Sequence, residues 1–503
     1  MDNYQTWLER TDVVRMAIVQ AQVLVAGTLT TRYMSTHGVI VDGIEYLPII
    51  MGTISISESI STSYSASISY GDLELANNNG EYDTWLGDIW VNKSVKIYIG
   101  SLPTDSAVTT LSQFELVFDG LIDDIDSKNR TRLNLKLRDK LEKLNTSVSE
   151  ALLGNYNPQG LTGYTNVYQN NLKPLCYGEV HNITPLLTEP ALLEYMVNLE
   201  AVEQITEVRD NGVPVAFTTV GTTLALPAGS FRLLKSPVGT VTCSVQGMKK
   251  TPNLASSAVT DTYTNTASNT LASILRLTGQ TLAYTEIDST SFGALGTQPI
   301  GLYLNSRVNV LATCQEIAKS CALILTVTRA GKVRLVELDV PTSASTAITE
   351  ADMVLNTLAV SEKVAVIAGV KLGYAKNWTV QTNLLTAIPQ EHKDLYSTEY
   401  LESVAIDTTI KNNFSLTTEP EQENTLLITK ADADAVALKK LNLFKAQRKV
   451  LTMTCTARLL SVQIGDAVTV TSSRFGLGSG ALGRVVSTKP NWLKGTIEIG
   501  VLV

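Results

Sequence analysis

The chain has 503 residues, of which 44% are hydrophobic and 17% are charged, and its formal net charge is −8. This composition is typical of an ordered protein with two to four domains and argues against extensive disorder. The acidic balance excludes a protein that wraps nucleic acid by neutralising its phosphates. No apolar stretch of the sequence reaches the length of a membrane span.

The first 145 residues alternate apolar and small polar residues in the manner of β-strands. The apolar run over 13–26 predicts one strand, and 38–48 predicts a hairpin that turns at Asp42-Gly43. Five more stretches have a period of two: 54–60, 64–70, 95–99, 114–118 and 133–137. We therefore expect one antiparallel β-domain over 1–147, closed or nearly closed.

The rest of the chain predicts a β-rich part, a mixed part and a second large β-domain. Residues 150–172 have no periodicity and indicate a long loop. Helices are expected at 269–278, 308–321 and 431–447, and Val308, Leu311, Ala312, Ile317 and Ala318 could share one face of the second. A hairpin is expected over 323–338, with its turn at Ala330-Gly331. The expected domains are then 148–250 (β-rich), 251–345 (α+β) and 346–503 (β with one helix).

Cysteines and histidines give little support for catalysis or metal binding. The five cysteines, Cys176, Cys243, Cys314, Cys321 and Cys455, form no C-x-x-C pair, and we expect buried thiols. The three histidines, His37, His181 and His392, lie far apart and lack zinc-ligand spacing. No G-x-S-x-G motif is present. We predict no catalytic, cofactor-binding or metal-binding residues, and no cofactor.

Gly478, Gly480 and Gly483 fit the pattern G-x-G-x-x-G. A dinucleotide site needs a helix that opens at such glycines, so that its N-terminus faces the pyrophosphate. Here the glycines stand between the strand-like segments 467–471 and 484–487. We therefore predict a hairpin loop.

Two other groups of residues allow a functional and a structural interpretation. Asp119, Asp123, Asp124 and Asp126 could supply oxygen ligands to Ca²⁺, but they lack EF-hand spacing, and solvated carboxylates of a turn are favoured. Whether an ion binds there stays open. Trp85 and Trp90 could form a carbohydrate platform, but packing against the edge of a β-barrel is favoured.

Three stretches of the chain resemble the tail-tip hub proteins of long-tailed bacteriophages (siphophages). The first comprises GDLELANNNGEYD (71–83), WVNKSVKIYIG (90–100), FELVFDGLID (114–123) and LNLKLRDKL (133–141). The second is KPLCYGEVHNITP (173–185), similar to a phrase K-P-x-x-x-G-x-V-x-N-x-x-P that follows the first barrel in such proteins. The third is LSVQIGDAVTV (460–470) with GRVVS (483–487), similar to the closing β-domain. The resemblance rests on the order of these three stretches along the chain.

The resemblance implies a mainly β, multidomain protein with a smaller α+β part. Its first and last β-domains would be tail-tube-like barrels or sandwiches, and three copies would form a ring that matches the hexameric tube. Such a hub closes the distal end of the tail tube, anchors fibre or spike proteins and guides DNA ejection through its lumen. It is a structural virion protein at the tail tip, assembled in the host cytoplasm, and not an enzyme. Its expected partners are its own copies and other tail proteins, such as the distal tail, tube and tape-measure proteins, with no sequence-specific binding of nucleic acid.

Two functions of other classes remain as alternatives. A tail-associated cell-wall hydrolase would need a carboxylate pair or a Cys/His or zinc site in a cleft. A tail adhesin that binds host saccharide would use Trp85, Trp90 or Trp378. The sequence does not show whether the middle domains are inserted into the β-domains.

Overall fold

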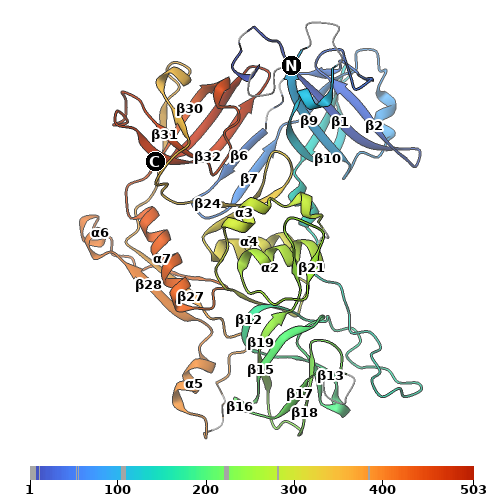
Figure 1. Cartoon of the computed structure of the whole chain (residues 1–503), viewed down its shortest axis with the longest axis vertical. Helices are drawn as coiled ribbons and strands as arrows, with labels where there is room; N and C mark the ends of the chain where they lie inside the picture. Colours follow the sequence, from blue (N-terminus) through green and yellow to red (C-terminus); the bar gives the residue numbers. More distant parts are fainter. Residues whose placement is uncertain are drawn as a thin grey trace. The chain divides into compact units, whose positions relative to one another are not determined.

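The structure is a computed structural model of the whole chain (Figure 1). It describes residues 7–10, 12–52, 54, 56–102, 109–219, 226–279, 282–382, 384 and 386–503. The chain forms two compact units. Unit 1 comprises Met1–Glu142, Ile324–Val366 and Ala446–Val503, and unit 2 comprises Lys143–Leu323 and Ile367–Lys445. The chain therefore leaves unit 1 twice to build unit 2.

The first part of unit 1 is a seven-stranded antiparallel sheet in the order β2-β1-β9-β10-β11-β8-β5. Its strands are β1 (Arg15–Val25), β2 (Thr28–Ser35), β5 (Ile50–Met51), β8 (Leu73–Ala76), β9 (Ser94–Ser101), β10 (Glu115–Asn129) and β11 (Arg132–Arg138). The alternating apolar residues of β9 and β11 are buried, as their period of two predicts. β1 instead buries four consecutive residues, Met16–Val19, because its first half is covered on both faces. The predicted strands over 13–26, 95–99, 114–118 and 133–137 are confirmed.

A small hairpin packs against one face of this sheet, where its residues Val41 and Tyr46 share a buried cluster with Met16 and Ile18 of β1. It consists of β3 (Val39–Val41) and β4 (Ile44–Tyr46), and its turn at Asp42 and Gly43 has φ values of 49° and 77°. Two consecutive positive φ values are the requirement of the tight hairpin turn that Asp-Gly favours. The hairpin predicted over 38–48 is therefore confirmed.

The last part of unit 1 is a sheet whose main path is β25-β31-β32-β33-β30-β26. Its strands are β25 (Thr346–Ile348), β26 (Ala359–Lys363), β30 (Lys449–Thr456), β31 (Ala467–Val470), β32 (Ala481–Asn491) and β33 (Thr496–Leu502). Only β25 and β31 pair in parallel among these strands. The strands β23 (Leu323–Val327) and β24 (Val333–Glu337) form the expected hairpin.

The hairpin formed by β6 (Ile56–Ile60) and β7 (Ala66–Tyr70) joins the sheet of the last chain segment. β6 pairs with β32 through Ser59 opposite Ser487 and Glu58 opposite Thr488. The two strands were predicted correctly, and their hairpin extends from the first chain segment into the sheet of the last. The period of a strand tells which side chains share a face; it does not tell which strand lies alongside.

Unit 1 has one continuous hydrophobic core that draws residues from both of its sheets. Val19, Ile97 and Leu135 of the first sheet belong to the same buried cluster as Met453 and Ile499 of the last sheet.

The turn between β23 and β24 also holds the two sheets of unit 1 together. The backbone N–H of Asp119 donates to the carbonyl oxygen of Arg329, at 3.1 Å. The guanidinium of Arg329 donates to the carbonyl oxygens of Leu460, at 2.6 Å, and Val462, at 2.8 Å. Two β-domains that are distant in the sequence thus act as one body.

Unit 2 contains two sheets that enclose a second core. One sheet has the order β16-β15-β19-β12-β22 and the other β13-β14-β18-β17. Their strands are β12 (Leu175–Ile183), β13 (Leu186–Glu189), β14 (Glu194–Met196), β15 (Val202–Asp210), β16 (Val213–Pro214), β17 (Phe217–Thr219), β18 (Ser230–Leu233), β19 (Val241–Met248) and β22 (Gly301–Leu304). Val208, Phe231 and Cys243 lie fully buried between them.

The predicted loop over 150–172 has no helix or strand, and buried polar residues fix it to unit 2. The carboxylate of Glu194 is fully buried and accepts two hydrogen bonds from Arg232, at 2.9 and 2.7 Å. Tyr156 of the loop donates to the other oxygen of Glu194 at 2.7 Å. Burial, and then this hydrogen bond, raise the pKa of Tyr156. Tyr164 of the loop similarly donates to Glu189.

The helices of unit 2 are α2 (Ala267–Ser273), α3 (Ser289–Ala294), α4 (Val310–Ser320), α5 (Gln390–Ser397), α6 (Thr408–Asn413) and α7 (Lys430–Phe444). A π-helical turn, Ile274–Thr278, continues α2. The predicted helices are confirmed within a few residues, but 346–503 contains three helices (α5, α6 and α7) where one was expected.

The predicted buried face of α4 was partly wrong. The Asn309 side chain caps the helix and sets its start at Val310, so Val308 lies outside. The buried face is Val310, Thr313, Cys314, Ile317, Ala318 and Ser320.

The remaining elements are short. A three-stranded sheet, β28-β27-β29, packs against α7, and β20 pairs with β21. The strands are β20 (Thr251–Pro252), β21 (Val259–Thr260), β27 (Gly369–Tyr374), β28 (Leu401–Ile406) and β29 (Gln422–Asn424). The 3₁₀ turns are Asp83–Gly87, Leu111–Gln113, Lys140–Leu144, Pro190–Leu192, Tyr284–Glu286, Glu350–Asp352 and Ala457–Leu459.

The fold class predicted from the sequence, mainly β with a smaller α+β part, is confirmed. All five cysteines are buried thiols, as expected. Within the described ranges, no helix combines the length and the apolar character that crossing a membrane requires.

Candidate functional site

The three histidines do not come together. His37 follows β2 in unit 1, His181 lies in β12, and His392 lies in α5. In the described part of the chain, no three His, Cys, Asp or Glu residues are grouped so that they could hold a metal ion.

The acidic group Asp119–Asp126 lies within strand β10, so its placement at a turn was wrong. Three of its carboxylates form ion pairs: Asp119 with Lys140 at 2.9 Å, Asp123 with Arg138 at 3.3 Å and Asp126 with Lys136 at 2.8 Å. Because side chains alternate along a strand, the acids face the basic residues of β11 and the segment that follows it. The pairs of Asp123 and Asp126 lie at the surface, whereas the Asp119–Lys140 pair is largely buried.

The structure explains the two neighbouring tryptophans as packing residues. Trp85 and Trp90 are 4% and 1% exposed, and their ring centroids are 5.6 Å apart. The indole N–H of Trp90 donates to the carbonyl oxygen of Trp85 at 2.8 Å. The predicted role at the edge of the first β-domain is confirmed, and neither ring offers an open face to a sugar.

Trp378 is also occupied by neighbours. Its ring meets Tyr303 edge to face, with centroids 6.2 Å apart, and the ammonium of Lys376 lies 4.3 Å from its centre. A saccharide platform would require one of these neighbours to move.

Gly478 and Gly480 lie in the loop between the paired strands β31 and β32, as predicted, whereas Gly483 lies within β32, opposite Val468. The carboxylate of Glu350 fastens this loop: it accepts from the Ser472 hydroxyl at 2.8 Å, the Ser473 amide at 2.7 Å and the Ser473 hydroxyl at 2.8 Å. These bonds, that of the Ser472 hydroxyl foremost, lower the pKa of Glu350.

A carboxyl group with a lowered folded-state pKa stabilises the fold above its ordinary pKa, and this contribution is lost as the pH falls through the folded-state value. We therefore expect Glu350→Gln to lower the urea concentration at which half of the protein is unfolded at pH 7. The difference between the midpoints of wild type and variant should become smaller below about pH 4. Glu362→Gln, an exposed carboxyl in β26, is the matched control and should have little effect at either pH. A gap for Glu350→Gln that is constant with pH would contradict the assignment.

The second motif of the sequence, KPLCYGEVHNITP, forms strand β12 and the residues around it, and two of its residues have positive φ. Gly178 has φ 63°, and a Cβ atom there would lie 1.8 Å from the carbonyl oxygen of Ile300. Asn182 has φ 54° and is 2% exposed. The glycine permits close approach to the chain before β22, and the asparagine turns its amide into a buried polar network.

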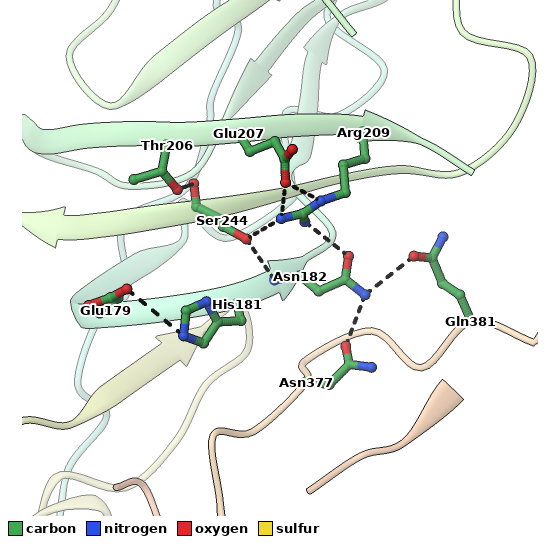
Figure 2. A network of polar contacts seen from close by, with 9 residues as sticks. All are labelled: Glu179, His181, Asn182, Thr206, Glu207, Arg209, Ser244, Asn377 and Gln381. Carbon is green, nitrogen blue, oxygen red and sulfur yellow. Dashed lines mark hydrogen bonds and ion pairs between the residues drawn. The ribbon is translucent and has the colours of Figure 1, made fainter. Parts of the chain in front are cut away.

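Figure 2 shows that this network joins β12, β15 and β19 to the segment after β27. The amide of Asn182 donates to Asn377 Oδ1 at 2.9 Å, to the Thr379 carbonyl at 2.7 Å and to Gln381 Oε1 at 3.3 Å. In addition, the Trp378 backbone N–H donates to the His181 carbonyl at 3.3 Å. A single side chain thus ties one sheet to a segment almost 200 residues further along the chain.

Arg209 supplies the charge of the network. Its side chain is only 8% exposed and pairs with Glu207 at 2.5 Å. The guanidinium also donates to Ser244 Oγ at 2.8 Å and to Asn182 Oδ1 at 3.5 Å, and it lies 5.2 Å from the centre of the Tyr396 ring. A buried cation is tolerated only with such partners.

His181 borders the network without activating a nucleophile. Burial lowers the pKa of His181 against the opposing effect of Glu179, whose carboxylate lies 3.9 Å from Nε2. Ser244 Oγ already accepts from Arg209 and from the Asn182 backbone N–H, at 3.4 Å. The arrangement is suited to holding the chain segment 375–400 (the 375–400 excursion), which contains α5, against the sheet of β12, β15 and β19.

Comparison with proteins of known structure finds two tail proteins and a chain of a virion. A tail protein from Neisseria meningitidis MC58 is 10% identical, with 97% of this chain and 96% of that chain covered and a TM-score of 0.40. The 43 kDa tail protein of prophage MuSo2 from Shewanella oneidensis is 11% identical, with 97% and 98% covered and a TM-score of 0.40. A chain of a native gene transfer agent virion is 13% identical, with 65% and 83% covered and a TM-score of 0.44.

No protein-family profile and no curated protein matches the sequence.

Sequence reasoning found only part of the network. Gly178, His181 and Asn182 stand in a motif that the sequence singles out, whereas no functional site was expected at Arg209, Ser244 or Asn377. No local signal identifies them, because each lies on a different element and only the folded chain brings them together.

Proposed function

We propose that this chain is a structural protein of a phage tail, the hub at the tail tip. In this role, several copies form a ring that closes the distal end of the tail tube, anchors fibre or spike proteins and leaves a lumen for DNA. Following the sequence resemblance, the ring contains three copies. It belongs to the virion and is assembled in the host cytoplasm.

The observation that carries the proposal is the construction of unit 1. The first and last segments of the chain form two β-sheets with one shared core, and the β6–β7 hairpin of the first segment adds to the sheet of the last. Three copies would then supply six β-domains held as rigid pairs, which suits a junction with a sixfold tube. Strand β2 is an edge of its sheet and could meet a neighbouring copy.

A structural function also suits the polar network. Its donors and acceptors are engaged with one another, and they fix the 375–400 excursion in one position. A hydrolase of the cell wall would instead need an acid and a base free to face a substrate. For saccharide binding, the faces of Trp85, Trp90 and Trp378 would have to be open.

Light scattering coupled to size-exclusion chromatography tests the assembly. We expect a mass near three times 54.4 kDa, because a closed ring buries the same interface in every copy. Electron microscopy of that fraction should show rings with a central opening. A monomer without rings at every concentration would contradict the hub, and peptidoglycan zymograms and glycan binding would then test the two alternatives.

A further inference from the structure

The charge of the chain is distributed unevenly between the two β-rich ends of unit 1. Residues 1–142 contain 19 acidic and 11 basic residues, a net charge of −8, whereas residues 446–503 contain 2 acidic and 7 basic residues, a net charge of +5. The remaining residues therefore carry a net charge of −5. Complementary charge of this kind favours association between unlike surfaces of identical chains.

The first β-domain exposes an acidic patch with an apolar centre, formed by Leu29, Glu81, Asp83, Leu86 and Ile89. Leu29, Leu86 and Ile89 are 55%, 42% and 55% exposed. Leu29 and Ile89 flank Leu24 in adjacent positions of the sheet, which places them on one face. Glu81 and Asp83 are exposed and precede Leu86 and Ile89 in one short chain segment, and Asp83 begins the 3₁₀ turn that carries Leu86. Large exposed apolar side chains with a polar rim are typical of protein interfaces.

The last β-domain exposes a basic patch, formed by Lys363, Lys449, Arg474 and Phe475. Lys363 and Lys449 lie directly opposite each other on β26 and β30. Phe475 is 42% exposed, its carbonyl accepts from Lys449 at 2.8 Å, and the Arg474 guanidinium lies 5.8 Å from its ring centre. Within the described part of the chain, no carboxylate forms an ion pair with Lys363, Lys449 or Arg474. Like charges placed opposite each other on a sheet repel unless a counter-charge arrives from outside.

We infer that the basic patch of one copy docks on the acidic patch of a second copy of this chain, head to tail. Figure 1 places β2 and β31, which belong to the two patch-bearing sheets, at opposite ends of unit 1, so one chain does not satisfy its own patches. Each copy would offer both surfaces, and a repeated head-to-tail contact closes into a ring when its rotation permits. The inference rests on the proposed function for its assembly and adds the surfaces that carry it.

Charge reversal tests this contact. We expect Lys363→Glu combined with Arg474→Glu to weaken self-association at least about tenfold, because two attractive charges become repulsive. Adding Glu81→Lys to the same chain should recover most of the loss, because the new acids of one copy meet the new lysine of the next. Lys494→Glu, an exposed basic residue of the same β-domain, is the matched control and should leave association unchanged. Association is measured by sedimentation equilibrium at low and high salt.

A cross-link locates the contact independently. Because all five native cysteines are buried, Glu81→Cys and Arg474→Cys introduce the reactive thiols. The chain with both changes should form covalent oligomers on mild oxidation, and mixing the two single variants should give a covalent dimer. If wild type associates but the reversals and the cross-link have no effect, this interface is wrong and the proposed function stands. If wild type never associates, both are wrong.

Discussion

Gly178→Ala is expected to lower the free energy of unfolding of unit 2 by about 3 kcal/mol or more. The new Cβ atom would lie 1.8 Å from the carbonyl oxygen of Ile300, so either β12 or the chain before β22 must move. Overpacking of this kind costs about 1–3 kcal/mol. The positive φ of 63° adds about 1–2 kcal/mol for a residue with a side chain. Urea unfolding followed by circular dichroism measures the sum.

Gly160→Ala is the matched control for this prediction. Gly160 has nearly the same φ, 65°, but no atom lies within 4 Å of the Cβ position. Gly160→Ala should therefore lower the free energy of unfolding only by the backbone strain, about 1–2 kcal/mol. Equal losses for the two variants would mean that the close approach of β12 and the chain before β22 contributes nothing, which would contradict our interpretation of Gly178.

The sequence was most informative where a structural signal is local. The alternating apolar residues of β9 and β11 and the Asp42-Gly43 turn depend on neighbouring residues, and the structure confirms them. The pairing of β6 with β32 joins residues more than 400 positions apart, and no pattern within either strand specifies it. Asp119 was misplaced for a similar reason: its partner Lys140 stands beyond the next strand, so the acidic run looked like a solvated turn.

In the candidate site, too, a local motif pointed to some residues, whereas others come together only in the folded chain. The motif over 173–185 identified Gly178 and Asn182, two positions where the backbone needs positive φ, although the sequence did not reveal why. Arg209 and Asn377 belong to the same network only because β15 and the excursion after β27 lie beside β12 in the folded unit. A network of this kind becomes predictable from a sequence only once the sheet order is known.

Asn182→Ala is expected to destabilise unit 2 by about 3–4 kcal/mol. The variant removes the donor to Asn377 and Thr379, at 2.9 and 2.7 Å, and leaves their oxygens buried without that partner. Each such loss costs about 1–3 kcal/mol. Asn182→Gly loses the same hydrogen bonds but tolerates φ 54°, so it should be about 1 kcal/mol more stable than the alanine variant. Asn356→Ala, an exposed asparagine with φ 62°, is the control and should cost only the strain.

The place where Asn182→Gly loosens the structure shows whether the network holds the 375–400 excursion or stabilises unit 2 as a whole. If the network holds the 375–400 excursion, hydrogen exchange in peptides from this segment should speed up in Asn182→Gly under conditions in which the rest of unit 2 stays protected. Local opening is expected because the excursion is anchored to β12 through Asn377 and through the amide of Trp378, and both anchors depend on the position of Asn182. Faster exchange throughout unit 2, with no excess in this segment, would instead mean that Asn182 only supports the core. A loosened excursion in a variant that still assembles would separate the role of this segment from that of the sheets in unit 1.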